Sequence, residues 1–178
     1  NKLTTTAVSL IQQRFSLYHV QLYLADAEQT TLTLLASTGE AGRQMLAAGH
    51  ALTINTTSIN SRAASQKQPV IVADTAASEN FMPHPLLPDT RSETAVPLLI
   101  GNNVVGVLDL QSSEPNTFTE ESLPAFVTLA GQLAIAIENS ALFTQQERLT
   151  TELQSNAAFL DTIFDSLPLM LFVKDAQD

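Results

Sequence analysis

The chain has 178 residues, 44% of them hydrophobic and 15% charged, so it is long enough for one well-packed domain and an extension but not for two full domains. Its formal net charge of −10 comes with scattered basic residues and no apolar run of the roughly 20 residues that span a bilayer, so we expect no nucleic-acid partner and no direct membrane contact. Cysteine is absent, which excludes disulfides, thiolate metal sites and thiol nucleophiles and is typical of a cytoplasmic protein.

The start of the chain predicts a helix followed by an antiparallel hairpin. Apolar residues recur at helical spacing over residues 3–16. The period then changes to two over residues 19–24, which places Leu22 on one face of a strand and Tyr23 on the other. A polar turn leads to a second strand at residues 31–36, which is rich in threonine.

The middle of the chain predicts short elements and a long loop. We expect a helical piece at residues 43–47, a strand at 51–54 and a helix at 57–65 that has a threonine or serine N-cap. A proline then precedes a buried strand at residues 70–72. Three prolines within residues 75–89 predict a long loop or lid.

Two longer strands and a helix follow. Residues 93–100 and 104–110 flank Gly101-Asn102-Asn103, which is a strong hairpin signal. Pro97 suits an edge position or a bulge in the first of these strands. Thr119 predicts the N-cap of a helix whose first turn is acidic.

The long C-terminal helix carries a heptad pattern beyond the predicted domain. Up to about Ala141 we expect it to pack on its own sheet, and beyond that point we expect a parallel homodimeric coiled coil. Unbroken from Glu120 to Ser166, it would be about 70 Å long. The apolar seam positions follow alternating steps of three and four residues, with Gln146 and Asn156 between them: Leu142, Leu149, Leu153, Leu160, Ile163 and Leu167.

Specific stretches of the sequence resemble the GAF family of sensor domains. Residues 58–75 resemble the helix, Gln-Pro breaker, strand and closing aspartate of that family, and residues 91–98 resemble its fourth strand. Residues 106–112 and 118–121 resemble its fifth strand and the start of its closing helix. The resemblance implies an α+β, GAF-like (profilin/PAS-like) fold with a central antiparallel sheet of five or six strands, helices packed on it and a long C-terminal helix.

The end of the chain resembles a second family. Residues 159–168, with Phe172-Val173-Lys174-Asp175, look like the entry into a PAS domain, which Pro168 would separate from the helix. We therefore expect a GAF-like domain at residues 1–143, a coiled-coil signalling helix at 144–167 and the truncated start of a PAS-like domain at 168–178. GAF followed by PAS is typical of bacterial sensor histidine kinases of two-component systems and of cyclic-dinucleotide enzymes.

Several activities of the GAF family require residues that this sequence lacks. Covalent bilin attachment and the reduction of methionine sulfoxide both use cysteine in this family, and the chain has none. In the cyclic-nucleotide-binding members, the resemblance implies a phenylalanine followed, after three residues, by Asp-Glu. In this sequence Ser122-Leu123 occupy the positions of that Asp-Glu after Phe118.

Haem would need only one axial histidine. His84 lies in the proline-rich loop that covers the pocket in this family, whereas we expect His19 and His50 at the surface or a sheet edge. Three histidines so far apart in sequence do not suggest zinc. We therefore predict no cofactor and no metal.

A small-molecule pocket is expected between one sheet face and the lid. Its candidate residues are polar side chains on or near otherwise apolar strands: Tyr23, His84, Arg91, Glu93 and Asp109. In the competing interpretation Arg91 pairs with a carboxylate, Tyr23 caps the sheet edge, or side chains fill the pocket.

No nucleophile–base pair is visible in the sequence, so we expect no catalytic residue and no enzyme activity in this segment. The resemblance implies a regulatory small-molecule-sensing or signal-relay domain of a cytoplasmic protein. We expect that protein to be a sensor histidine kinase. The alternative is a structural dimerisation and transmission module without a ligand.

Overall fold

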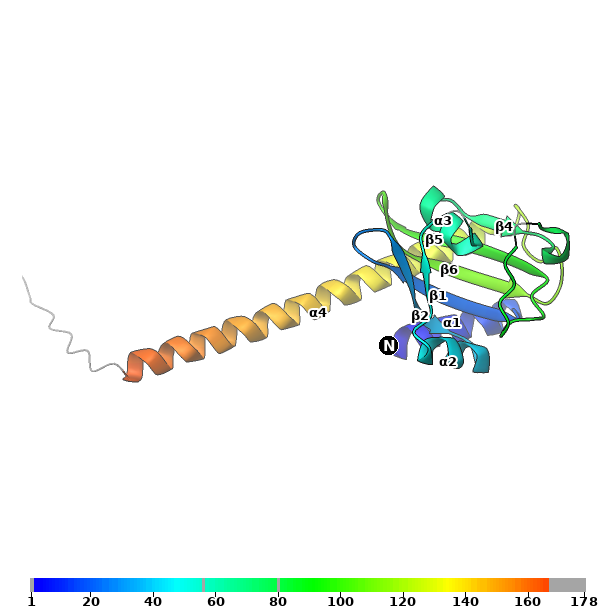
Figure 1. Ribbon diagram of the computed structural model, residues 1–178. Coiled ribbons are helices and arrows are strands. Elements are labelled where there is room, and N and C mark those ends of the chain that lie inside the picture. Colours follow the sequence, from blue (N-terminus) through cyan, green and yellow to red (C-terminus); the bar gives the residue numbers. More distant parts are fainter. Residues whose placement is uncertain (1, 56, 80, 167–178) are drawn as a thin grey trace, which may run out of the picture. The chain divides into compact units, whose positions relative to one another are not determined.

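The computed structural model describes residues 2–55, 57–79 and 81–166, and it confirms the expected α+β fold with a long C-terminal helix (Figure 1). Residues 168–178, the predicted start of a PAS-like domain, lie outside the described residues. In chain order the elements are α1 (Lys2–Phe15), β1 (His19–Ala25), β2 (Thr31–Ser37), α2 (Gly39–Ala47), β3 (Ala51–Thr53), α3 (Ile59–Gln66), β4 (Val70–Val72), the 3₁₀ turn η1 (Thr75–Ala77), β5 (Ser92–Ile100), β6 (Asn103–Ser112) and α4 (Leu123–Ser166).

The strands form one six-stranded antiparallel sheet in the order β3-β2-β1-β6-β5-β4. The two predicted hairpins, β1–β2 and β5–β6, are joined where β1 pairs with β6. Pro97 pairs with Val107, but β4 reaches only as far as Ala95, so no strand lies on the other side of Pro97. Since proline lacks an N–H, it is tolerated at this locally free edge, as predicted.

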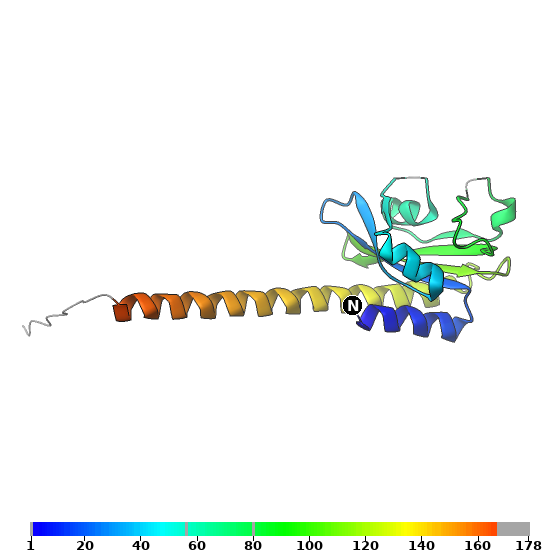
Figure 2. The same cartoon turned by 60° about the horizontal axis from the view of Figure 1, so that its bottom comes forward.

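One face of the sheet packs on helices α1 and α4. Leu22, Leu108 and Val96 lie on this face together with Val8 of α1. Figure 2 shows α1 and the first part of α4 beneath the strands. The α4 contacts come from one helical stripe of largely buried residues: Phe126, Ala130 and Ala134. Two of these are alanines, which lets the helix approach the sheet closely.

The opposite face packs on α2, α3 and the loop between β4 and β5. Its buried residues include Tyr23, Val72 and Val107 from the sheet and Met45 and Ala63 from the helices. Because adjacent residues of a strand point to opposite faces, Tyr23 lies on this face and Leu22 on the other, as the period-two pattern predicted.

The start of α4 differs from the sequence-based prediction. Thr119 and Ser122 form a reciprocal cap, in which each backbone N–H donates to the other's hydroxyl, at 3.3 and 3.0 Å. Regular helix begins only at Leu123, whereas the prediction started it at Glu120. Pro124 explains the delay, since it has no N–H to bond back to residue 120.

The described chain divides into two compact units, the first ending at Ile137 and the second beginning at Glu138. In the second unit the seam residues of α4 are exposed, with Leu149 at 51% and Leu153 at 69%. Within the described residues, α4 is also the one helix long and apolar enough to cross a membrane by length and composition. The expectation of no membrane contact stays a prediction, and Phe126, Ala130 and Ala134 of this helix are buried against the sheet.

Replacement of Gly106 by alanine tests the tight contact between β1 and β6. A methyl group at this position would run into the backbone oxygen of Tyr23 on the neighbouring strand. We expect Gly106→Ala to lower the free energy of unfolding by ~1–3 kcal/mol, measured by urea denaturation. The matched control is Gly131→Ala within α4, where the added carbon meets nothing within 4 Å and helix propensity improves. Equal stability of the two variants would contradict the close approach.

Candidate ligand pocket

A cavity of about 170 Å³ lies on the face of the sheet that carries Tyr23. Its floor comes from β1, β5 and β6, which contribute Gln21, Tyr23, Glu93 and Gln111. One wall comes from the start of α3, and the cover comes from residues 81–87 of the long loop. The long loop therefore lies where the sequence predicts a lid.

The five candidate residues divide into three groups. Tyr23, Glu93 and His84 line the cavity, and Asp109 is fully buried beside it. Arg91 does not line the cavity but forms an ion pair with Asp74 at 3.1 Å, as the competing interpretation proposed. Tyr23 is 1% exposed on β1, a central strand, so it does not cap a sheet edge.

Two buried carboxyl groups form the polar centre of the site. The β5–β6 register pairs Ala95 with Asp109 and Glu93 with Gln111, so both acids project from neighbouring strands onto the cavity face. Burial, reinforced by the charge of Asp109, raises the pKa of Glu93 well above its usual value, and nearby Arg62 opposes this only weakly. Burial also raises the pKa of Asp109, although polar contacts with Glu93 and Gln111 favour its charged form. The pair therefore retains a proton at pH values where an exposed carboxyl would have lost it.

Hydrogen bonds connect these acids to the strands around them. Gln111 Nε2 donates to Asp109 Oδ2 at 2.7 Å, while Gln111 Oε1 accepts from the Thr90 hydroxyl at 2.7 Å. Across the floor, the Tyr23 hydroxyl donates to Gln21 Oε1 at 3.0 Å. Burial, and then the charges of Asp109 and Glu93, raise the pKa of Tyr23, so its phenol stays neutral and keeps its proton.

Three buried polar atoms at this site lack a hydrogen-bond partner among the described residues. They are Asn60 Oδ1, Arg62 Nε and Asp109 Oδ1. Asn60 and Arg62 line the cavity from α3, and Asn60 is only 5% exposed. Because buried polar groups normally find partners, Asn60 Oδ1 and Arg62 Nε leave one acceptor and one donor unpaired on the cavity wall.

The histidines are closer together than their sequence spacing indicated. The rings of His50 and His84 lie 5.4 Å apart at the cavity, with the Tyr23 ring 6.1 Å from His50. His19 is 3% exposed and its Nε2 lies 2.9 Å from the Ser37 hydroxyl, so its expected surface position is wrong. Burial, and secondarily the charge of His84, lower the pKa of His19 to about 4 and lower that of His50.

No group of three or more histidine, cysteine, aspartate or glutamate side chains in the described part of the chain could hold a metal ion. His50 and His84 line the cavity as ring walls. Sequence reasoning missed His50, Gln21 and Gln111 as cavity residues. The glutamines were accessible to it, since each stands two residues from a candidate, Tyr23 or Asp109, on the same strand face.

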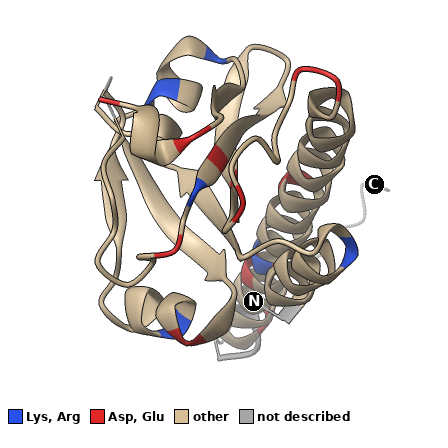
Figure 3. Ribbon diagram, turned by 90° about the vertical axis from the view of Figure 1, so that its right-hand side faces the viewer, with Lys and Arg blue, Asp and Glu red and all other residues tan. Residues whose placement is uncertain are grey.

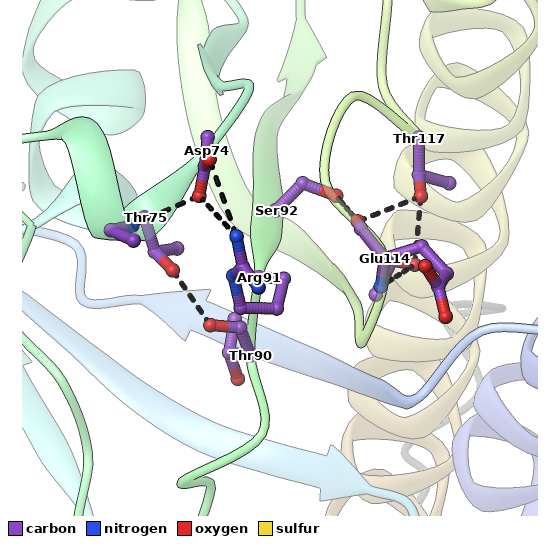
Figure 4. A network of polar contacts seen from close by, with 9 residues as sticks. Asp74, Thr75, Thr90, Arg91, Ser92, Glu114 and Thr117 are labelled. Carbon is purple, nitrogen blue, oxygen red and sulfur yellow. Dashed lines mark hydrogen bonds and ion pairs between the residues drawn. The ribbon is translucent and has the colours of Figure 1, made fainter.

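A polar network fixes the return of the lid loop to the sheet (Figure 4). Asp74 accepts from Arg91 and from the backbone N–H of Ala76, so it both caps η1 and binds the start of β5. The Thr75 hydroxyl donates to the carbonyl oxygen of Thr90 at 2.7 Å. Next to Arg91, the Ser92 hydroxyl donates to the Glu114 carbonyl in the segment that leads to α4. The lid and the α4 connection are therefore anchored at the same end of β5.

Comparison with known proteins identifies the family to which the fold belongs. A family model described as GAF domain matches residues 1–138. The GAF domain of a phosphoenolpyruvate-protein phosphotransferase from Coxiella burnetii aligns with a TM-score of 0.67 and 20% identity, covering 79% of this chain and 83% of that one. A free methionine-R-sulfoxide reductase from Neisseria meningitidis, solved with its substrate, aligns with a TM-score of 0.66 and 23% identity, covering 78% of this chain and 77% of that one.

A third structure is a domain of a putative two-component sensor histidine kinase protein from Sinorhizobium meliloti 1021. It aligns with a TM-score of 0.59 and 15% identity, covering 82% of this chain and 96% of that one. At these identities the likeness concerns the fold alone. No curated protein sequence matches the chain significantly.

The buried acid pair predicts an unusual dependence of stability on pH. A raised folded-state pKa means that the folded protein binds more protons than the unfolded chain, so stability falls as the pH rises from about 4 through the raised values. Glu93→Gln keeps the size of the side chain and supplies an amide N–H donor in place of the carboxyl O–H, but it removes one titratable group. We expect the variant to be more stable than the parent by roughly 1–3 kcal/mol at pH 8, with a flatter pH profile in urea denaturation.

The control for this experiment is Glu120→Gln, because Glu120 is exposed and lies away from the cavity. It should follow the parent profile. If the free energy of unfolding changed with pH in the same way for Glu93→Gln and the parent, the raised pKa values of the acid pair would be contradicted.

Proposed function

Since the chain belongs to the GAF domain family, whose members are generally signal-sensing or regulatory, we propose that it senses a small molecule within a cytoplasmic signal-transduction protein. By the resemblance of its sequence, that protein is a sensor histidine kinase. The observation that carries the proposal is the lidded cavity with unpartnered buried polar atoms on its walls.

The two faces of the sheet supply a route from the cavity to α4. On β1, Tyr23 lines the cavity and its neighbour Leu22 belongs to the core that also holds Phe126 of α4. On β6, Asp109 lies beside the cavity between Leu108 and Leu110, which belong to the same core. A ligand that shifts β1 or β6 by a fraction of an ångström therefore changes the packing under the helix, because close-packed cores transmit displacement.

We further propose that α4 passes this change to a partner chain as a parallel homodimer. Its exposed leucines repeat at heptad spacing, and a single helix cannot bury them by itself. Gln146 and Asn156 on the same seam would fix the register of two helices at some cost in stability. Figure 3 shows few, separated basic segments, which supports the absence of a nucleic-acid partner.

A ligand-free dimerisation and transmission module remains the second candidate. One observation favours it: several polar side chains at the cavity already form hydrogen bonds with protein groups, namely Tyr23 with Gln21, and Gln111 with Thr90 and Asp109. An enzymatic role is not part of the proposal. Two structural relatives are free methionine-R-sulfoxide reductases, but the resemblance implies cysteines for that chemistry and this sequence has none.

Native mass spectrometry of the freshly purified chain, combined with a thermal-shift screen of small metabolites, distinguishes the two candidates. We expect at least one compound to stabilise the protein by a few degrees. Leu52→Trp, which fills the cavity from β3, should abolish that shift without unfolding the domain. A protein that carries no extra mass and responds to no compound would support the ligand-free module instead.

Charged substitutions on the α4 seam test the homodimer. Because Leu149→Glu/Leu153→Glu removes two apolar contacts per helix, we expect the dissociation constant to rise at least ~100-fold, measured by sedimentation equilibrium or light scattering. The control Thr151→Glu/Ser155→Glu adds the same charge at the same spacing on the outer side of the helix. A dimer unaffected by the leucine substitutions would contradict the coiled coil.

A further inference from the structure

We infer that the cavity recognises its ligand through a protonated amine, which Glu93 receives with Asp109 behind it and Asn60 beside it. The inference rests on the proposed sensing function and adds the chemical class of the ligand: a small molecule with a primary ammonium group and a compact apolar body.

The first argument is the ionic state of the acids. Glu93 is 4% exposed in the cavity wall and Asp109 is fully buried beside it. Among the described residues, the ion pairs involve Arg43 with Glu40 and Arg91 with Asp74, so no cationic side chain lies within ion-pair distance of either acid. With one proton retained, the pair still carries one negative charge when the other carboxyl is ionised, and an ammonium group in the cavity would compensate it.

The second argument is the type of polar atom that lacks a partner. Asn60 Oδ1 and Asp109 Oδ1 are both acceptors, and Asn60 faces the cavity from α3 while being 95% buried. An ammonium group has three donors and no acceptor. It could therefore bond Glu93 and Asn60 together, whereas an anion or a carbonyl would be repelled by these acceptors and would find only Arg62 Nε as an unpartnered donor among the described cavity residues.

The remaining walls suit the rest of such a molecule. Apolar side chains from β3, α3 and the lid close the cavity: Leu52, Ile59, Phe81 and Leu87. The Tyr23 ring adds an aromatic surface, which favours a nearby cation. At about 170 Å³, the cavity is smaller than the roughly 300–1,000 Å³ typical of drug-sized ligands, so the apolar body must be short.

Arg62 determines whether a carboxylate accompanies the amine. It lines the cavity, and its buried Nε has no partner among the described residues. A simple amine and an amino acid share the ammonium group and differ in this second charge. The two sources are therefore separable by experiment.

The test is isothermal titration calorimetry of the full chain at pH 7.5 with three probes of matched length: n-pentylamine, n-pentanol and norleucine. We expect pentylamine to bind at least tenfold more tightly than pentanol. Glu93→Gln and, independently, Asn60→Ala should each weaken pentylamine binding at least tenfold, while Glu120→Gln should not. Retention of the folded circular dichroism spectrum by either variant keeps the comparison valid.

The norleucine titration distinguishes an amino acid ligand from a simple amine. Tighter binding of norleucine than of pentylamine, with the gain lost in Arg62→Gln, would assign an amino acid, whereas equal or weaker binding would assign a simple amine. Equal affinity for pentanol and pentylamine, or unchanged pentylamine binding by Glu93→Gln, would overturn the ammonium site. If neutral or anionic compounds then stabilise the parent but not Leu52→Trp, the sensing function holds and only the ammonium site is wrong. If no compound stabilises the parent, both the sensing function and the ammonium site are wrong.

Discussion

Each central strand of this sheet has to satisfy two environments at once, and the rest of the structure depends on that constraint. On one face Leu22, Leu108 and Val96 must be dry and close-packed against α1 and α4. On the other, residues of the same strands line a cavity with polar groups. The alternation of side chains along a strand makes this possible, because a shift of one residue in register would place Asp109 in the helical core and a leucine in the cavity.

The buried acid pair is the costly consequence of that arrangement. Glu93 and Asp109 hold their places because neighbouring strands bring them together and Gln111 bonds to one of them. Burial raises the pKa of both carboxyl groups, and the charge of Asp109 raises that of Glu93 further, against the opposing charge of Arg62. Buried charged groups that lower the stability of a protein are often stabilised when a ligand binds to them. At such groups the free energy of ligand binding can be coupled to a change in packing.

The helix α4 meets two requirements that differ along its length. Between Phe126 and Ala134 it presents one narrow buried stripe to the sheet. From Leu142 onwards the apolar residues continue at heptad spacing, with no described part of the chain to cover them. The same element therefore forms part of a folded core and presents an exposed apolar seam, for which we propose a partner helix. The network around Asp74 and Arg91 adds a second link, because it anchors the lid next to the segment that leads to α4 (Figure 4).

The sequence by itself determined the order of the elements, since each depends on local signals. Period-two alternation marked β1 and β2, Gly101-Asn102 marked the β5–β6 turn, and the prolines of residues 75–89 marked the lid. Lone polar residues on apolar strands also singled out Tyr23, Glu93 and Asp109 for the cavity face. The order of the elements was predictable because alternation and turn chemistry act between near neighbours in the chain.

Only the tertiary structure decided which distant residues meet. The pairing of β1 with β6 joins the two hairpins and buries His19, which the sequence placed at the surface. The fold also brings His50 to His84 across 34 positions of sequence, and it turns Arg91 away to Asp74. A local pattern carries no information about such contacts, because they depend on how strands and loops that form independently are packed against one another.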